Sequence, residues 1–291
     1  MISRYGGSHH LDSAPPATLR GPLMTTMSLA VPGARLHYEV RGTGPLVLLT
    51  AAPMDARSFE PLAELLAGDH TVLTTDPRGI NRSPVDHPDR DSTPQERADD
   101  LARLLTHLDA GPAVALGSSG GAVSVLALAQ LAPELVHTVI AHEPPLQQLL
   151  PDREQLEAAT EKMIATYLAG DVAGAWQQFL RIADIELPLE VVEQMFFADR
   201  SPQTVADEHF QFAHMLRATA SWQPDLNRLR SVPTRIVVGI GEESAGQLCD
   251  RASRTLAEAL GSEPEMFPGD HIGFAEVPDA FAERLRKLLE R

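Results

Sequence analysis

The sequence predicts an α/β fold in which a mostly parallel sheet is wrapped by helices on both sides. Short, nearly continuous apolar runs recur along the chain, as is typical of strands buried on both faces. These runs are PLVLLT (45–50), HTVLTTD (70–76), PAVALG (112–117), LVHTVIAH (135–142) and TRIVVGIG (234–241). Helical patterns lie between most of them, with short connections, and this alternation of strand and helix builds a parallel sheet.

The remaining elements complete this fold at both ends. From Ser28, the stretches SLAV, PG and ARLHYEV predict an antiparallel hairpin. FEPLAELLA predicts a helix after the first buried run. TPQERADDLARLLTHLDA predicts a longer helix, in which Thr93 is the N-cap, Pro94 takes the first helical position and Glu96 completes a capping box. Near the C-terminus, EPEMF predicts the last strand and DAFAERLRKLLE the closing helix.

One interval breaks the alternation and defines the expected domain organisation. Residues 146–221 contain four stretches with helical spacing and no strand pattern, which predicts a helical insertion into a core of residues 27–145 and 222–291. Residues 1–26 are rich in Gly, Pro, Ser and Thr and lack a long apolar run, so we expect a flexible extension rather than a secretory signal or membrane helix.

Composition excludes several classes of partner. The formal net charge is −16 over 291 residues, so neither nucleic acid nor an anionic membrane surface is an expected partner. Cys249 is the single cysteine, so the chain has no internal disulfide and no Cys/His cluster for a structural zinc ion. This cysteine usage predicts a reducing, cytoplasmic location. The sequence does not determine an oligomeric state.

The stretch GSSGG carries the strongest chemical signal. It follows a buried run and begins an apolar helix, so it fits the G-x-S-x-G motif with Gly117, Ser119 and Gly121 at its fixed positions. In such a nucleophile elbow a strained backbone lifts the serine hydroxyl clear of the sheet, and the flanking residues must be small because backbones crowd there. If Ser118 were the nucleophile, Leu116 would take a flanking position, which is a poorer fit.

At this point the chain, from Met27 to Arg291, resembles the α/β-hydrolase superfamily. DPRGINRS (76–83) is similar to the family segment D-x-R-G-x-G-x-S, with Asn81 in place of the middle glycine. VPTRIVVGIGEE (232–243) resembles the strand that carries the catalytic acid, and FPGDHIGF (267–274) resembles the loop that carries the histidine. The resemblance implies an eight-stranded sheet, a helical cap at 146–221 and the chain order serine, acid, histidine.

A serine hydroxyl needs a neighbouring base, and an imidazole needs a carboxylate that fixes its tautomer. His271 is the expected general base. Glu242, three residues after Gly239 at the end of a predicted strand, matches the family position of the acid and is the preferred candidate. Glu143, at the end of the preceding strand, is the alternative, because some relatives carry their acid there. Two aspartates are weaker candidates, Asp250 on a predicted helix and Asp270 beside the histidine.

The resemblance also implies an oxyanion hole of two backbone N–H groups. One belongs to Gly120, directly after the nucleophile, and the other to Ala52 in the loop TAAPMD. Relatives usually have His-Gly where this chain has Thr50 and Ala51. Because the donors are backbone groups, we expect the substitution to preserve the hole.

These residues predict a serine hydrolase that cleaves a small or medium apolar ester, thioester, lactone or amide through an acyl-enzyme on Ser119. No metal site and no organic cofactor are implied. One alternative is a non-catalytic small-molecule binder on the same fold. Others are a perhydrolase-type relative or a carrier-protein thioesterase, whose acidic partner could dock on a basic patch of Arg228, Arg230 and Arg235.

Overall fold

An eight-stranded sheet forms the centre of the computed structural model, which describes residues 24–198 and 200–290. The strands are β1 (Thr25–Val31), β2 (Ala34–Arg41), β3 (Leu46–Ala52), β4 (Thr71–Thr75), β5 (Ala113–Ser119), β6 (Val136–His142), β7 (Arg235–Gly241) and β8 (Glu265–Phe267). Their order in the sheet is β1-β2-β4-β3-β5-β6-β7-β8. The pairs β1/β2 and β2/β4 are antiparallel and all other neighbouring pairs are parallel.

The predicted fold class is confirmed, since every apolar run predicted as a buried strand coincides with one of β3 to β7. The hairpin forms β1 and β2, and the EPEMF stretch forms β8. β1 begins at Thr25, two residues before the predicted start of the core at residue 27. The rest of the predicted N-terminal extension, residues 1–23, lies outside the described residues.

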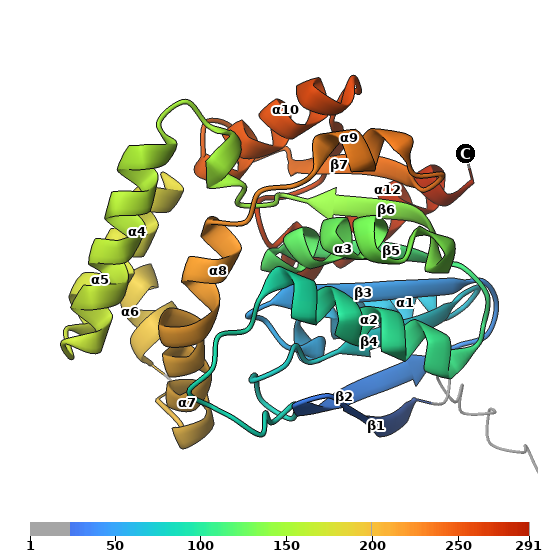
Figure 1. Ribbon diagram of the computed structural model, residues 1–291, viewed down its shortest axis with the longest axis horizontal. Helices are drawn as coiled ribbons and strands as arrows, with labels where there is room; N and C mark the ends of the chain where they lie inside the picture. The colour runs from blue at the N-terminus through green and yellow to red at the C-terminus, as the bar shows by residue number, and fades with distance from the viewer. Residues whose placement is uncertain (1–23, 199, 291) are drawn as a thin grey trace, which may run out of the picture.

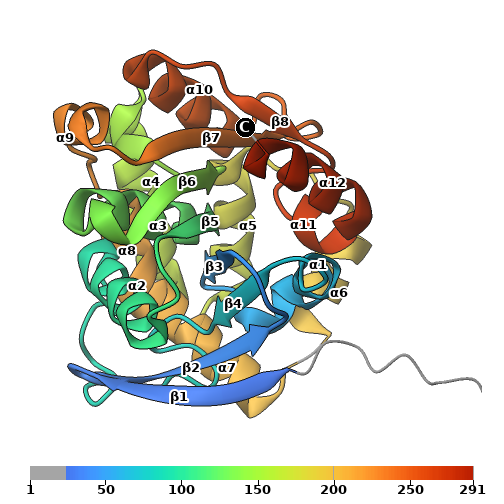
Figure 2. The same cartoon turned by 90° about the vertical axis from the view of Figure 1, so that its right-hand side faces the viewer.

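Helices cover both faces of the sheet (Figure 2). Those of the core are α1 (Glu60–Leu66), α2 (Pro94–Leu108), α3 (Gly120–Leu131), α9 (Leu226–Ser231), α10 (Leu248–Leu260), α11 (Gly273–Glu276) and α12 (Pro278–Leu289). One apolar core joins the sheet to α2, α3 and α10, and a second joins it to α1 and α12 on the other face. The predicted capping box of α2 forms, with Thr93 and Glu96 each bonding the other's backbone N–H. Within the described residues, no helix combines the length and apolarity needed to cross a membrane.

Between the 3-10 turn Gln147–Leu149, which follows β6, and helix α9, the described chain contains helices and no strand. These are α4 (Arg153–Leu168), α5 (Val172–Ala183), α6 (Leu189–Phe197), α7 (Pro202–Phe210) and α8 (Leu216–Ala220), with a π-helical turn at Gln211–Met215 between α7 and α8. They stand together at the left of Figure 1, at the end of the sheet toward which the β6 arrow points. They have their own apolar cluster, in which Tyr167 and Phe212 stack with ring centroids 4.3 Å apart.

The segment 76–83 joins this helical group to the core. Gly79 has φ +82°, and a Cβ there would lie 2.0 Å from the Phe210 ring of α7, so only glycine fits. Asn81 has φ +47°, a conformation that asparagine tolerates better than most residues. Its backbone N–H donates to an Asp207 carboxylate oxygen at 2.8 Å. Asparagine can therefore replace the family glycine at this position while it also contacts the cap.

A fully buried histidine, His142, ends β6. Its Nδ1 lies 3.2 Å from the Ser118 hydroxyl, and its Nε2 has no hydrogen-bond partner among the described residues. Its ring meets the rings of Phe267, Phe274 and Phe281 edge to face. Burial in this apolar setting lowers the pKa of His142 from 6.5 to about 4.

This buried imidazole predicts a loss of stability in mild acid. Between pH 6.5 and about 4 the unfolded chain protonates this histidine while the folded chain does not, so the free energy of unfolding falls as the pH falls. At about 1.4 kcal/mol per pKa unit, the contribution is about 3 kcal/mol. Urea unfolding of the wild type and His142→Asn across this pH range should show a shallower decline in the variant. The exposed His87, changed to Asn, is the matched control, and an equal slope in the wild type and His142→Asn would contradict the prediction.

Candidate active site

Ser119 lies at a sharp turn between β5 and α3, which begins at the next residue. Its φ of 55° and ψ of −124° are strained for a residue with a side chain. The glycines around it are required by close packing. A Cβ on Gly117 would lie 2.3 Å from the carbonyl oxygen of Gly121, and one on Gly121 would lie 2.5 Å from the Thr50 carbonyl oxygen. The local backbone thus has the geometry that the G-x-S-x-G motif predicts.

His271 lies on the loop between β8 and α11 and lines the same cavity as Ser119. Asp270 shapes this loop, because its carboxylate accepts the Ile272 N–H at 2.8 Å and its carbonyl accepts the Gly273 N–H at 3.1 Å. The His271 side chain is 25% exposed, toward the cavity it lines. The described residues contain no hydrogen bond between Ser119 and His271.

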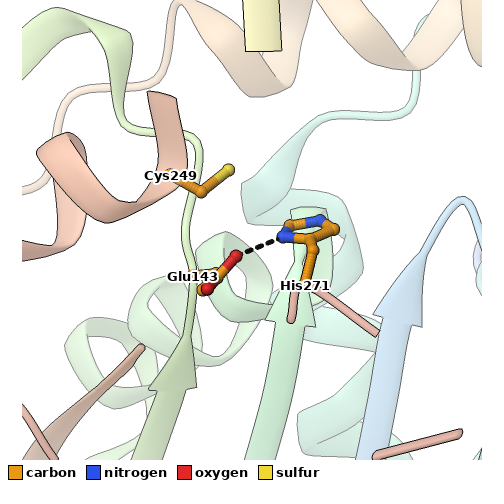
Figure 3. Close-up of side chains that lie close together, drawn as sticks. All are labelled: Glu143, Cys249 and His271. Atoms are coloured by element: carbon orange, nitrogen blue, oxygen red, sulfur yellow. Dashed lines mark hydrogen bonds and ion pairs between the residues drawn. The ribbon is translucent and has the colours of Figure 1, made fainter. Parts of the chain in front are cut away.

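Glu143 is the carboxylate that meets the histidine (Figure 3). Its Oε2 lies 2.5 Å from Nδ1 of His271, and its Oε1 accepts the backbone N–H of Gly241 at 2.8 Å. Glu143 directly follows β6, is completely buried and has φ +51°. Because Nδ1 donates to the carboxylate, Nε2 of His271 is left free for proton exchange within the cavity.

The electrostatics of this pair favour its ionised form. Burial by itself raises the pKa of Glu143, but the hydrogen bond and the charge of His271 outweigh burial and lower that pKa to about 2. For His271, burial by itself lowers the pKa. The Cys249 sulfur and the Glu143 carboxylate beside the ring outweigh it, so the pKa of His271 lies well above its ordinary value.

The structure does not bring Glu242, the preferred acid, to the histidine. The Glu242 backbone N–H donates to the Phe267 carbonyl at 2.8 Å, and the side chain is exposed. Asp250 accepts hydrogen bonds from Gly246 and Arg254, and so supports its own helix and the loop before it. The geometry therefore corrects the order of preference between the two glutamates: Glu143, the alternative, occupies the position beside the imidazole.

The two predicted oxyanion donors lie beside the serine. Ala52 pairs in register with Ser119 across β3 and β5, and both Ala52 and Gly120 line the cavity. The backbones are in close contact here, since a Cβ on Gly120 would lie 2.6 Å from the Ala52 carbonyl oxygen. Ala51, which stands in place of the usual glycine, is accommodated within β3, where it is 2% exposed and pairs in register with Ser118.

Above Ser119 and His271 lies a cavity of about 870 Å³ including its open mouth. The helical segment contributes apolar side chains to it, among them Met163, Phe179 and Ile182. No Lys, Arg, Asp or Glu is among the described residues that line it, and its polar groups include the amides of Gln147, Gln211 and Gln247. The cavity is thus suited to an uncharged, largely apolar ligand.

Sequence reasoning missed Cys249, which lines the cavity at the start of α10. One signal was available, because ligands of α/β sheets bind beyond the carboxyl ends of the strands and Cys249 follows shortly after β7. The predicted basic patch lies elsewhere. Arg235 begins β7, at the end of that strand opposite to Gly241 and the site, and Arg228 and Arg230 lie on the preceding helix α9.

Comparison with known proteins identifies the family of this chain. Residues 46–284 match the model of the alpha/beta hydrolase family. An uncharacterized hydrolase, YraK, from Bacillus subtilis (strain 168) is 32% identical over 277 residues, covering 91% of this chain and 96% of the relative. Zearalenone hydrolase from Bionectria ochroleuca is 25% identical over 269 residues, covering 90% and 96%. The crystal structure of a hydrolase from Pseudomonas aeruginosa PA01 superposes with a TM-score of 0.69 at 21% identity, covering 91% of this chain and 98% of the other. The chain belongs to the alpha/beta hydrolase family, and it is a hydrolase.

Proposed function

We propose that the protein is a serine hydrolase that cleaves a small or medium, uncharged, apolar ester, thioester, lactone or amide through an acyl-enzyme on Ser119. The observation that carries this proposal is the buried Glu143–His271 pair at the same cavity as the strained Ser119. A carboxylate that fixes an imidazole tautomer beside a serine elbow is the arrangement used for acyl transfer.

In the proposed reaction, Oγ of Ser119 attacks the acyl carbonyl carbon while Nε2 of His271 accepts the hydroxyl proton. Glu143 stabilises the imidazolium, and the backbone N–H groups of Ala52 and Gly120 bind the oxyanion. Collapse of the tetrahedral intermediate expels the leaving group, which takes the proton from His271. Water, deprotonated by His271, then attacks the acyl carbon, and the acid product leaves as His271 returns the proton to Oγ of Ser119. In ligand-free structures such catalytic hydrogen bonds are often long, and the Ser119–His271 contact is expected to tighten when substrate binds.

The cavity supports the proposed substrate class. Its described lining has no charged Lys, Arg, Asp or Glu side chain, so a substrate carboxylate would lose water without gaining a counter-ion. The apolar side chains from residues 146–221 cover the space above Ser119, which supports a lid role for this segment. The predicted basic patch lies at the opposite end of β7, about 20 Å along that strand, which makes it a poor docking site for a carrier protein that feeds the cavity.

The proposal predicts hydrolysis of p-nitrophenyl esters, acetate through octanoate, that depends on Ser119. Ser119→Ala should lower kcat by at least about 10⁴-fold, because the nucleophile is removed. A fluorophosphonate should label the wild type and not the variant. Ser118→Ala is the matched control, since its hydroxyl faces His142 rather than the cavity. Absence of both turnover and labelling in the wild type would contradict the proposal and favour a non-catalytic binder.

Substitution of the two glutamates should have very different effects on kcat. Glu143→Gln should lower kcat by about 10³- to 10⁴-fold, because an amide at this position fixes the wrong tautomer or leaves the imidazolium unstabilised. Glu242→Gln, with an exposed side chain, should change kcat by less than about threefold. Circular dichroism should first show that both variants are folded to the same extent. If Glu242→Gln is the inactive variant, the assignment of Glu143 as the acid is wrong.

The pH profile supplies a second test of Glu143. His271 must be neutral to accept a proton, and its pKa is raised well above 6.5, so kcat/KM should rise with pH through an inflection on the alkaline side of 6.5. In Glu143→Gln the loss of the neighbouring negative charge should move this inflection to lower pH. A purely structural role for Glu143 would lower the rate without moving the inflection.

A further inference from the structure

Cys249 is a group near the reacting atoms for which the proposed hydrolysis has no use. It is the second residue of α10, is partly buried and lines the same cavity as Ser119 and His271. In Figure 3 its sulfur points toward the His271 ring, and Cys249 and Glu143 lie on the same side of that ring. One ligand atom from each of Glu143, Cys249 and His271 lies within 4.8 Å of the others. Three different metal-binding groups therefore converge on one point at the edge of the cavity.

The donors match a particular class of cation. Thiolate, imidazole and carboxylate are the ligands that Zn²⁺ takes, and three protein ligands with an open fourth position are typical of accessible zinc sites. In a tetrahedral site with bonds of about 2.0 to 2.3 Å the ligand atoms lie roughly 3.3 to 3.8 Å apart. Cys249 would move inward by at most about 1.5 Å, and the 2.5 Å contact of Glu143 with His271 would open by about 1 Å.

Charge also favours a divalent cation at this position. A thiolate and a carboxylate together supply two negative charges, which neutralise Zn²⁺ next to a cavity whose described lining has no Lys or Arg. Cys249 and His271 both line the cavity, so water from the cavity can complete the coordination shell. Hard cations such as Mg²⁺ and Ca²⁺ prefer oxygen ligands and do not suit a thiolate.

We propose that Cys249, His271 and Glu143 form a binding site for a soft divalent cation such as Zn²⁺, and that occupancy reversibly inhibits the hydrolase. The Cys249 thiol and the His271 imidazolium each give one proton to solvent, and the thiolate sulfur and a deprotonated imidazole nitrogen then bind the metal. The bound metal then takes the imidazole lone pair that proton transfer requires, or it replaces the contact between the carboxylate and the imidazole that proton transfer requires. The sequence predicts no such site, because its three ligands are far apart along the chain. The inhibition rests on the proposed role of His271, whereas the binding site rests on the geometry alone.

Binding can be measured without turnover in Ser119→Ala. Zn²⁺ titrated into this variant by calorimetry, with a non-thiol reductant present, should bind one ion per chain. Co²⁺ should give a thiolate-to-cobalt charge-transfer band. In Ser119→Ala/Cys249→Ala the band should vanish and the Zn²⁺ affinity should fall by more than about 100-fold, because the loss of even an outer partner costs 10–100-fold. A control in which His9 and His10 are both changed to Ala removes the adjacent histidine pair of the N-terminal segment and should retain the band.

Inhibition is measured on the Ser119 protein, with each variant's rate normalised to its own metal-free rate. Zn²⁺ should inhibit ester hydrolysis and EDTA should restore it, while the concentration for half inhibition should rise by more than about 100-fold in Cys249→Ala. Unchanged Zn²⁺ affinity or unchanged inhibition in Cys249→Ala would overturn the proposal. If no ester is hydrolysed at all, a 1:1 cobalt band that requires Cys249 still supports the site, so failure of the proposed function remains distinguishable.

Discussion

The buried carboxylate of Glu143 is the constraint on which the arrangement of the site depends. It is completely buried, and it accepts one hydrogen bond from the Gly241 N–H and one from His271. An isolated carboxylate in such a place would cost several kcal/mol, so both donors must be present in the folded state. This single group therefore ties the end of β6 to the end of β7 and to the histidine loop. Together with the Cys249 sulfur, it raises the pKa of His271 well above its ordinary value.

Two neighbouring strands end in the same unusual way. Ser119 is the last residue of β5 and has φ +55°, and Glu143 directly follows β6 and has φ +51°. Their predecessors, Ser118 and His142, are register partners whose side chains also approach to 3.2 Å. Positive φ turns each side chain away from the pleat of its strand, and such strain persists only where surrounding contacts fix the backbone. The parallel register thus places two strained residues side by side at the carboxyl edge of the sheet.

Much of this could be predicted from the sequence, for physical reasons that differ between residues. Ser119 was predictable because crowding at the elbow leaves a local glycine pattern, and His271 because it lies on a short loop before a well-marked last helix. Which carboxylate meets the histidine was not predictable. Glu143 and Glu242 both follow a strand directly, and only tertiary contacts decide which side chain turns inward. At Glu242 the backbone N–H pairs with Phe267 and the side chain faces solvent, whereas at Glu143 the reversed φ directs the carboxylate to the histidine. The place of Cys249 depends in the same way on how α10 packs after β7.

The wall of the cavity formed by α8 is fixed to the elbow by a buried charge rather than by apolar contacts alone. Arg97 of α2 donates to Thr219 of α8 at 2.9 Å and to the Ser124 hydroxyl at 2.9 Å, and Ser124 in turn donates to the Gly120 carbonyl at 3.0 Å. Burial lowers the pKa of Arg97 to about 10, which still leaves it charged at neutral pH. Hydrogen bonds are directional and apolar contacts are not, so this network sets the position of Thr219 relative to the nucleophile. Changes to the side chains of α4 and α5 that line the cavity can therefore alter its shape while the contacts of Arg97, Ser124 and Gly120 are preserved.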